Sequence, residues 1–226
     1  MFKQYESGFM EFIYLSLIHF DFSFQNQKIN LSNTFRRIGE ELLKSVYNYR
    51  QNEGAGDEVL NLEDPKSRML ACLTILRTLS QVDLIIQVLE LVKQDLKDED
   101  NKKLFLSFHG TWTVIKWCKL GNQVVLNLAI DVYLLMSIEW KLVGKFLESC
   151  SNENWFSQIS IVLRNSNVNS SPSANSNCLD LRVIEKISIL MQKLSKIRSN
   201  KKYFDMFSLT NIFNDLLKRF GHDIDY

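Results

Sequence analysis

The chain has 226 residues, of which 46% are hydrophobic and 12% aromatic, so a domain of this length can bury a sizeable core. Its formal charge of +1 excludes a global field that would concentrate nucleic acid or an anionic membrane on it. Only eight Gly and two Pro are present, too few for the frequent turns of a β-rich fold, so long helices are expected.

The N-terminal segment predicts two helices. In residues 1–22, apolar side chains at spacings of three and four predict an amphipathic helix with a buried stripe. A second helix is expected to begin at a Ser32 cap and to run from Phe35 to Val46. We assign residues 1–50 to this helical pair and the polar stretch 51–64 to a linker. The predicted stripe of the first helix comprises Phe9, Phe12, Ile13, Ser16, Leu17 and Phe20.

Two more helices follow the linker. Two acidic residues before Pro65 form a helix-start signal, and this helix is expected to end near Leu79. Asp83 can cap the next helix, which ends in the charged run 97–103.

From residue 102 onward the chain repeats an order of short, middle and long apolar helices. The first repeat is KKLFLSF, TWTVIKWCKL and NQVVLNLAIDVYLLMSI. The second is WKLVGKFLESC, NENWFSQISIVLR and LDLRVIEKISILMQKLSKI, and the third begins with NKKYFDMF and TNIFNDLLKRF. Such long apolar helices need neighbours on both sides, which stacked repeats supply.

The repeat period supports an armadillo-like fold. The anchors Phe105, Phe146 and Phe204 are 41 and 58 residues apart, and the second gap contains a 13-residue run of almost only Asn and Ser. We treat this run as part of a disordered insertion at 165–178, which leaves a gap of 45 residues, within the armadillo and HEAT period of about 40 to 47. The prediction is a single all-α domain, residues 1–226, with an armadillo/HEAT-like right-handed α-solenoid of about three to four repeats over 65–226.

Residues at matching positions of the repeats are predicted to start or end helices. Six residues beyond each anchor lie Thr111, Asn152 and Thr210, which we predict to be N-caps. Gly110 is expected to end the helix before it. Trp112 and Trp117 could form a base-stacking platform, but burial in the core explains them better.

The sequence shows no set of residues with the spacing expected of a catalytic or metal-binding site. The GxG of residues 53–57 lies in an acidic loop, and His19, His109 and His222 have no partner at metal-ligand spacing. We therefore expect a non-enzymatic protein without cofactor, metal or small-molecule substrate.

The sequence also predicts a cytoplasmic location. Glu6 and Glu11 interrupt the N-terminal apolar residues, which argues against a signal peptide, and the stretch 124–138 is too short to span a bilayer. We expect no transmembrane segment. The widely spaced cysteines are expected to be reduced and structural: Cys72, Cys118, Cys150 and Cys178.

A basic cluster at 182–202 is the main charged feature. It follows one face of the last long helix and continues beyond it, which fits either a binding surface or a solvated face that compensates the helix dipole. Aligning LLM at 134–136 with ILM at 189–191 places Asn127 and Asp131 opposite Arg182 and Lys186. The candidate partner-binding residues are Asn127, Asp131, Arg182, Lys186, Lys193, Lys196, Lys201 and Lys202.

Several consecutive stretches carry a family resemblance. FMEFIYLSL, TFRRIGEELLKSV, FLESCSN and LDLRVIEKISILMQKLSKIRSNKKYFDMF resemble the C-terminal helical region of the coiled-coil domain-containing protein 138 family. The resemblance implies a centrosome- and cilium-associated group with a long coiled coil before this region, and it brings no catalytic residues. The chain departs from the pattern by lacking that coiled coil, by its Asn/Ser insertion and by stopping at Tyr226.

The leading functional hypothesis is a protein–protein interaction (scaffold) domain whose partners are other proteins, including those of the centrosome or cilium base. A last repeat without a cap further predicts self-association. The alternative is a nucleic-acid or anionic-lipid binder that uses the basic cluster 182–202, although the near-neutral total charge argues against nucleic acid.

Overall fold

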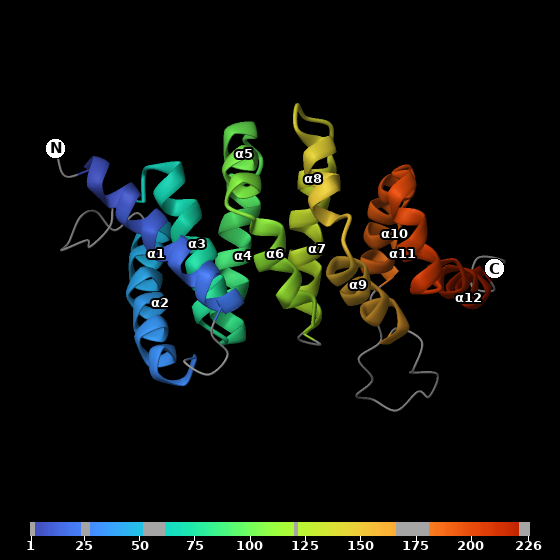
Figure 1. Ribbon diagram of the computed structural model, residues 1–226, viewed down its shortest axis with the longest axis horizontal. Coiled ribbons are helices and arrows are strands. Elements are labelled where there is room, and N and C mark those ends of the chain that lie inside the picture. The colour runs from blue at the N-terminus through green and yellow to red at the C-terminus, as the bar shows by residue number, and fades with distance from the viewer. Residues whose placement is uncertain (1–2, 24–27, 52–61, 120–121, 166–180, 222–226) are drawn as a thin grey trace. The chain divides into compact units, whose positions relative to one another are not determined.

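The computed structural model of the chain describes residues 3–23, 28–51, 62–119, 122–165 and 181–221 (Figure 1). These residues form twelve α-helices and two short 3-10 helices, with no strand among them, which confirms the all-α prediction for this part of the chain. Most of the predicted linker and of the Asn/Ser insertion lies outside the described residues. The chain divides into two compact units, Met1–Val114 and Ile115–Tyr226, each described by itself below. The single domain and the solenoid stay predictions.

The first unit contains the predicted N-terminal pair and the start of the repeats. The second helix begins at Lys28, so the prediction of a Ser32 cap is wrong; no Gly or Pro interrupts residues 28–32, and the helix continues through them. Asp83 lies inside its helix, in the first turn, and Gln81 is the N-cap residue. The helices of this unit are α1 (Lys3–Ser23), α2 (Lys28–Gln51), α3 (Pro65–Thr78), α4 (Val82–Asp95), α5 (Glu99–Ser107) and α6 (Gly110–Val114).

Helix α3 is the centre of the first unit and packs against α1, α2, α4, α5 and α6. It begins where the sequence predicts, because the Asp64 carboxylate accepts hydrogen bonds from the backbone N–H and the hydroxyl of Ser67, both at 2.8 Å. All residues from Ser67 to Leu76 are buried. Among them, Arg68 forms an ion pair with Asp95 of α4 at 2.9 Å, with both side chains at most 10% exposed.

Helix α1 buries a face that is shifted from the predicted stripe: Leu17 is buried as predicted, but Phe9 and Phe12 are not. Met10, Tyr14 and Leu17 are buried, whereas Phe9 is 63% and Phe12 is 68% exposed. The Tyr14 hydroxyl donates a hydrogen bond to the Phe108 carbonyl at 2.6 Å, and this buried polar contact directs the Tyr14 side of the helix inward. Burial raises the pKa of this hydroxyl, so it remains a donor.

The second unit contains the remaining helices in the predicted repeat order. Its long apolar helices α7 and α10 pack against each other, and α9 contacts both α11 and α12. The elements are η1 (Ile115–Lys119), α7 (Gln123–Ser137), α8 (Val143–Cys150), α9 (Glu153–Asn165), α10 (Leu181–Ser195), η2 (Arg198–Asn200), α11 (Lys201–Met206) and α12 (Leu209–Gly221).

Of the three predicted N-caps, one is confirmed. The Asn152 side-chain oxygen accepts a hydrogen bond from the Trp155 backbone N–H at 3.0 Å. Thr111 and Thr210 are not caps, because α6 begins at Gly110 and α12 at Leu209, one residue earlier in each case.

The ends of the short helices explain this shift. His109 and Ser208 adopt left-handed conformations, with φ of 53° and 52°, and each ends the short helix before it. Each stands four residues after its anchor phenylalanine, so the repeat phase is visible in the backbone. Gly110 is required for a different reason: a Cβ there would lie 2.4 Å from carbon atoms of the Phe105 ring. The prediction that Gly110 is the helix-ending residue is therefore wrong by one position.

Candidate interaction surface

Helix α10 carries three of the eight predicted partner-binding residues, Arg182, Lys186 and Lys193, and its neighbours determine how exposed they are. Its apolar stripe, which includes Val183, Ile187, Leu190 and Leu194, is buried. The charged side chains beside this stripe divide into a set that contacts α7 and a set that faces solvent.

Lys186 belongs to the first set. Its ammonium nitrogen lies 2.6 Å from the Asn127 side-chain oxygen and 2.6 Å from a carboxylate oxygen of Asp131, both on α7. The Lys186 and Asp131 side chains are only 24% and 14% exposed. The predicted position of Asp131 opposite Lys186 is therefore confirmed, and the Lys186 ammonium group donates hydrogen bonds to both Asn127 and Asp131. The position of Asn127 opposite Arg182 stays a prediction.

Lys193 also contacts α7, through a partner that the sequence analysis missed. Its ammonium group donates a hydrogen bond to the Ser137 carbonyl at 2.7 Å. Ser137 is the last residue of α7, where carbonyl groups lack helical partners and the helix dipole favours a cation. Lys186 and Lys193 thus join α10 to α7 near two different points along its length.

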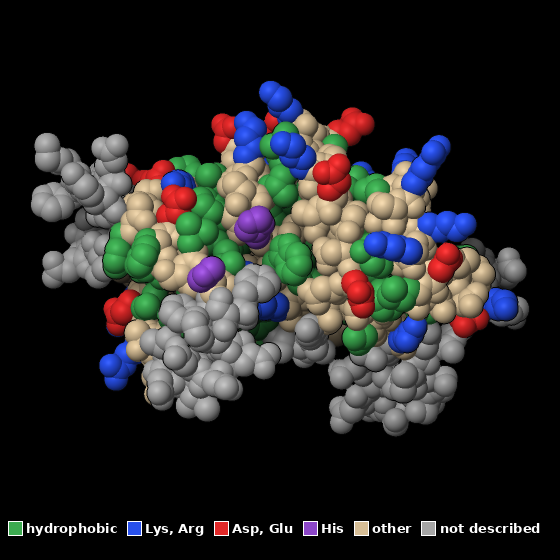
Figure 2. Space-filling model, in the orientation of Figure 1, with side chains coloured by type: hydrophobic (Ala, Val, Ile, Leu, Met, Phe, Trp, Pro, Cys, Tyr) green, Lys and Arg blue, Asp and Glu red, His purple; other side chains and the backbone are tan. Residues whose placement is uncertain are grey.

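The remaining basic residues of the cluster are exposed. Arg182, Lys196, Lys201 and Lys202 are exposed, and the Lys202 ammonium lies 4.7 Å from the centre of the Tyr203 ring. Figure 2 shows Lys and Arg side chains gathered over α10 and α11. Residues 181–219 hold nine Lys or Arg against three Asp or Glu, a net charge of +6 in a chain whose total is +1. That these residues bind a partner stays a prediction.

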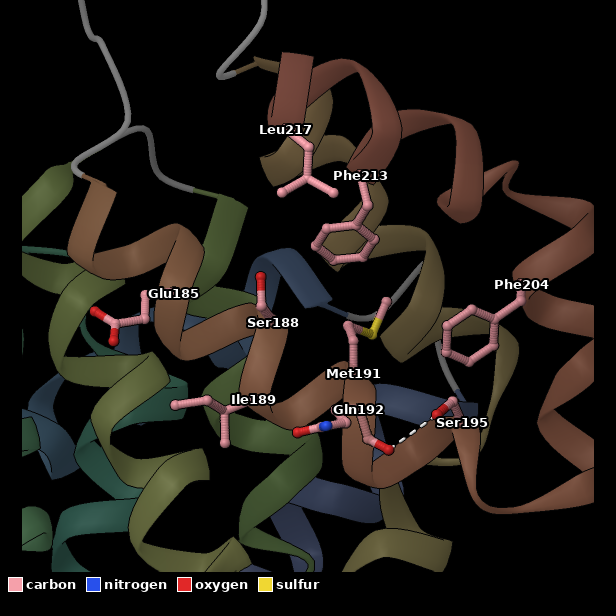
Figure 3. Close-up of a pocket in the computed structure, with 9 residues that line it drawn as sticks. All are labelled: Glu185, Ser188, Ile189, Met191, Gln192, Ser195, Phe204, Phe213 and Leu217. Carbon is pink, nitrogen blue, oxygen red and sulfur yellow. Dashed lines mark hydrogen bonds between the residues drawn. The ribbon is translucent and has the colours of Figure 1, made fainter. Parts of the chain in front are cut away.

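Beside this basic end lies an open groove of about 540 Å³ between α10, α11 and α12 (Figure 3). Its walls include Ile189 of α10, Phe204 of α11, and Phe213 and Leu217 of α12. The sequence analysis missed it, although the α12 side chains stand four residues apart on one helix face. Only the packing of α11 and α12 shows which apolar residues stay uncovered.

The titratable groups with large pKa shifts are buried in the core. Burial raises the pKa of the Cys118 thiol to about 12, and it also raises the pKa values of the Cys72 and Cys150 thiols. All three thiols are free, as predicted, while Cys178 lies outside the described residues. A buried protonated thiol is a poor nucleophile and a poor metal ligand.

Neither a metal cluster nor a membrane span is found among the described residues. No group of three or more His, Cys, Asp and Glu side chains is placed there to hold a metal ion. None of the described helices has the length and apolar character needed to cross a membrane. Of the two tryptophans considered for base stacking, Trp117 is buried and Trp112 is 38% exposed.

The described residues define an all-helical protein whose second unit exposes a basic and apolar face at its last helices. The chain belongs to the coiled-coil domain-containing protein 138 family: the family described as "Coiled-coil domain-containing protein 138, C-terminal domain" matches residues 3–225. The resemblance noted from the sequence is thereby confirmed.

Relatives named coiled-coil domain-containing protein 138 show the same relationship. The Homo sapiens protein is 33% identical over 212 residues, the Macaca fascicularis protein 32% over 212, and the Mus musculus protein 33% over 211. Each match covers 89% of this chain but only 29–30% of the relative, so the chain spans less than a third of the length of these proteins. No solved structure matches the chain.

Proposed function

We propose that this chain is a non-catalytic protein–protein interaction (scaffold) domain that binds partners through the exposed face of its last helices. The observation that carries the proposal is the combination of exposed Lys196, Lys201 and Lys202 with the open apolar groove beside them. Apolar surface supplies binding energy and nearby charge supplies orientation, which is the usual division of roles in protein interfaces.

The candidate residues have different parts in this proposal. Lys196, Lys201, Lys202 and Arg182 are exposed and can meet a partner directly. Asn127, Asp131, Lys186 and Lys193 act through the α7–α10 contact, where their polar groups already hydrogen-bond to each other or to the backbone. The proposed binding face therefore rests on α10 held firmly against α7.

Affinity capture with the intact chain tests the proposal. The variant K196E/K201E/K202E reverses three exposed charges of the proposed face, and K44E/K97E/K103E reverses three exposed lysines of the first unit as a matched control. We expect captured proteins to be lost with the first variant and retained with the second. Capture that is unchanged by either variant, or no capture above an unrelated control protein, would contradict the proposal.

A second candidate is nucleic-acid or anionic-lipid binding by the same basic cluster, favoured by its net charge of +6. With roughly five phosphate contacts, the affinity for single-stranded RNA would fall about 100-fold between 50 and 200 mM salt. Weak salt dependence of any measured RNA or vesicle binding would exclude this candidate.

We further propose an armadillo-like stacking of the repeats, self-association and a cytoplasmic location at the centrosome or cilium base. Self-association is supported by α1, where Phe9, Phe12 and Leu15 are 63%, 68% and 48% exposed. Light scattering above micromolar concentration should show oligomers that the F9S/F12S variant loses, and a clean monomer would contradict this.

The proposed location at the centrosome or cilium base follows from the family resemblance. Imaging of a fluorescently tagged chain in ciliated cells tests it.

A further inference from the structure

We infer that the groove between α10, α11 and α12 binds an amphipathic helix of about three turns whose polar positions are rich in Asp and Glu. This inference rests on the proposed scaffold function and deepens it by naming the chemistry of the partner.

The groove has the length and direction of a helix. Its α10 wall includes Glu185, Ser188, Gln192 and Ser195, which recur at helical spacing along one face of α10, together with Ile189 and Met191. The outermost two are ten residues apart, which corresponds to about 15 Å along the helix axis. A partner helix of about ten or eleven residues spans that distance.

The other wall is apolar and incompletely covered. On this wall Leu217 is 70% exposed, and Phe204 and Phe213 are half-buried. Ile189, on the α10 side of the groove, is 40% exposed. In Figure 3 the rings of Phe204 and Phe213 and the Leu217 side chain lie around the space in front of α10. A helix with apolar residues at positions i, i+3, i+4 and i+7 would cover these side chains from the open side.

The two serine hydroxyls on the α10 wall need no hydrogen-bond acceptor from the partner. The Ser188 and Ser195 hydroxyls donate to the carbonyls of Ile184 and Gln192 at 2.8 and 2.9 Å, so their protons are already bound within the helix. Gln192 is exposed and can hydrogen-bond to a polar side chain at the edge of a bound helix. Apolar contact, with little need for matched polar groups, can therefore provide most of the affinity.

Charge determines the composition of the partner. The exposed residues Lys196, Arg198 and Lys201 follow directly on the Ser195 end of the groove, whereas Glu185 lies at the opposite end. Acidic residues on a bound helix are attracted to the Ser195 end, where these three cations are exposed. A lysine-rich helix would be repelled.

A helix fits this surface better than RNA or a membrane does. The basic side chains stand at one end of the groove, whereas the groove itself is lined by Ile189, Met191, Phe204, Phe213 and Leu217 together with Glu185, and a phosphate would lose hydration and meet a like charge there. An apolar helix face with acidic flanks meets both features at once.

A helix library tests the inference with the full chain. The probe is a displayed library of 14-residue peptides with Leu at i, i+3, i+4 and i+7 and with every other position drawn from Glu, Lys, Gln and Ser. We expect selected peptides to be enriched in Glu over Lys. Their affinity should fall about 10- to 100-fold for Leu217→Glu, since burial of a leucine side chain is worth about that range. The control Ile161→Glu changes a residue of α9 that is 46% exposed and outside the groove, and should leave affinity unchanged.

Four results would overturn the inference: no enrichment, enrichment of Lys, equal loss for both variants, or binding that survives Leu217→Glu. If wild-type chain dimerises and only Leu217→Glu abolishes the dimer, a second copy occupies the groove and the inference is wrong. If the wild-type chain binds vesicles with anionic lipids, and Leu217→Glu but not Ile161→Glu abolishes this binding, a membrane occupies the groove and the inference is also wrong. Proteins captured equally by wild type and Leu217→Glu would refute the groove while leaving the scaffold function standing.

Discussion

Replacing Lys186 by Met should destabilise the second unit. The substitution keeps the length of the side chain but removes the ammonium group that lies 2.6 Å from both Asn127 and Asp131. The Asp131 carboxylate, 14% exposed, then loses the cation that faces it. Breaking a fully buried pair costs about 3 to 5 kcal/mol, and residual solvent access at this site reduces the expected cost to about 2 kcal/mol.

Urea denaturation followed by tryptophan fluorescence measures this cost. Three of the four tryptophans, Trp117, Trp140 and Trp155, lie in the second unit, and all three are buried, so the signal reports mainly on that unit. The matched control is Lys201→Met, which removes an exposed ammonium group and should change the free energy of unfolding by less than about 0.5 kcal/mol.

A double-mutant cycle separates the ion pair from other effects of the substitution. The pair Lys186→Met and Asp131→Leu should show a coupling energy of about 1 to 2 kcal/mol, because the double variant leaves no uncompensated charge at this contact. The reasoning is refuted if Lys186→Met is as stable as wild type, or if the two single effects simply add.

Three other substitutions or conditions test the described core. Gly110→Ala places a methyl group 2.4 Å from the Phe105 ring and should lower stability by about 1 to 3 kcal/mol, measured by thermal unfolding. Arg68→Met leaves Asp95 unpaired, with the two side chains 8% and 10% exposed, and should cost about 3 kcal/mol or more in urea denaturation of the first unit. Because the pKa of the Cys118 thiol is about 12 in the folded chain and about 9 when unfolded, its contribution to stability is complete below pH 9 and is lost as the pH rises from 9 towards 12. Alkylation kinetics should accordingly show protection of this thiol at pH 8 in the native chain and none in urea.

The helix order could be predicted because its determinants are local. Asp64 and Asn152 each start a helix by accepting a hydrogen bond from a backbone N–H three residues later, so a short stretch of sequence is enough to predict both. The contact of Asp131 with Lys186 was also predictable, since two long helices with the same apolar phase pack in a register that aligned sequences reveal. The alignment of the two long helices was therefore enough to predict this contact without a three-dimensional structure.

The buried face of α1 could not be predicted in this way. Both sides of the helix are apolar, with Met10 and Tyr14 on one side and Phe9 and Phe12 on the other. Periodicity alone does not choose between them. The choice depends on the Phe108 carbonyl, 94 residues away in the sequence, which accepts the Tyr14 hydrogen bond.

Sequence reasoning also treated the basic residues of 182–202 as one cluster, and the structure separates them by what each ammonium group contacts. Lys186 and Lys193 hydrogen-bond to α7, whereas Lys196 and Lys201 are exposed at the end of the groove. Charge reversal of all of them together would change the proposed partner surface and weaken the α7–α10 packing at once, so a loss of binding would have no single cause. Reversal of the exposed lysines alone, with unfolding measured beside binding, distinguishes a partner surface from a helix contact. The function of this domain is therefore best tested at Lys196 and Lys201, and its stability at Lys186.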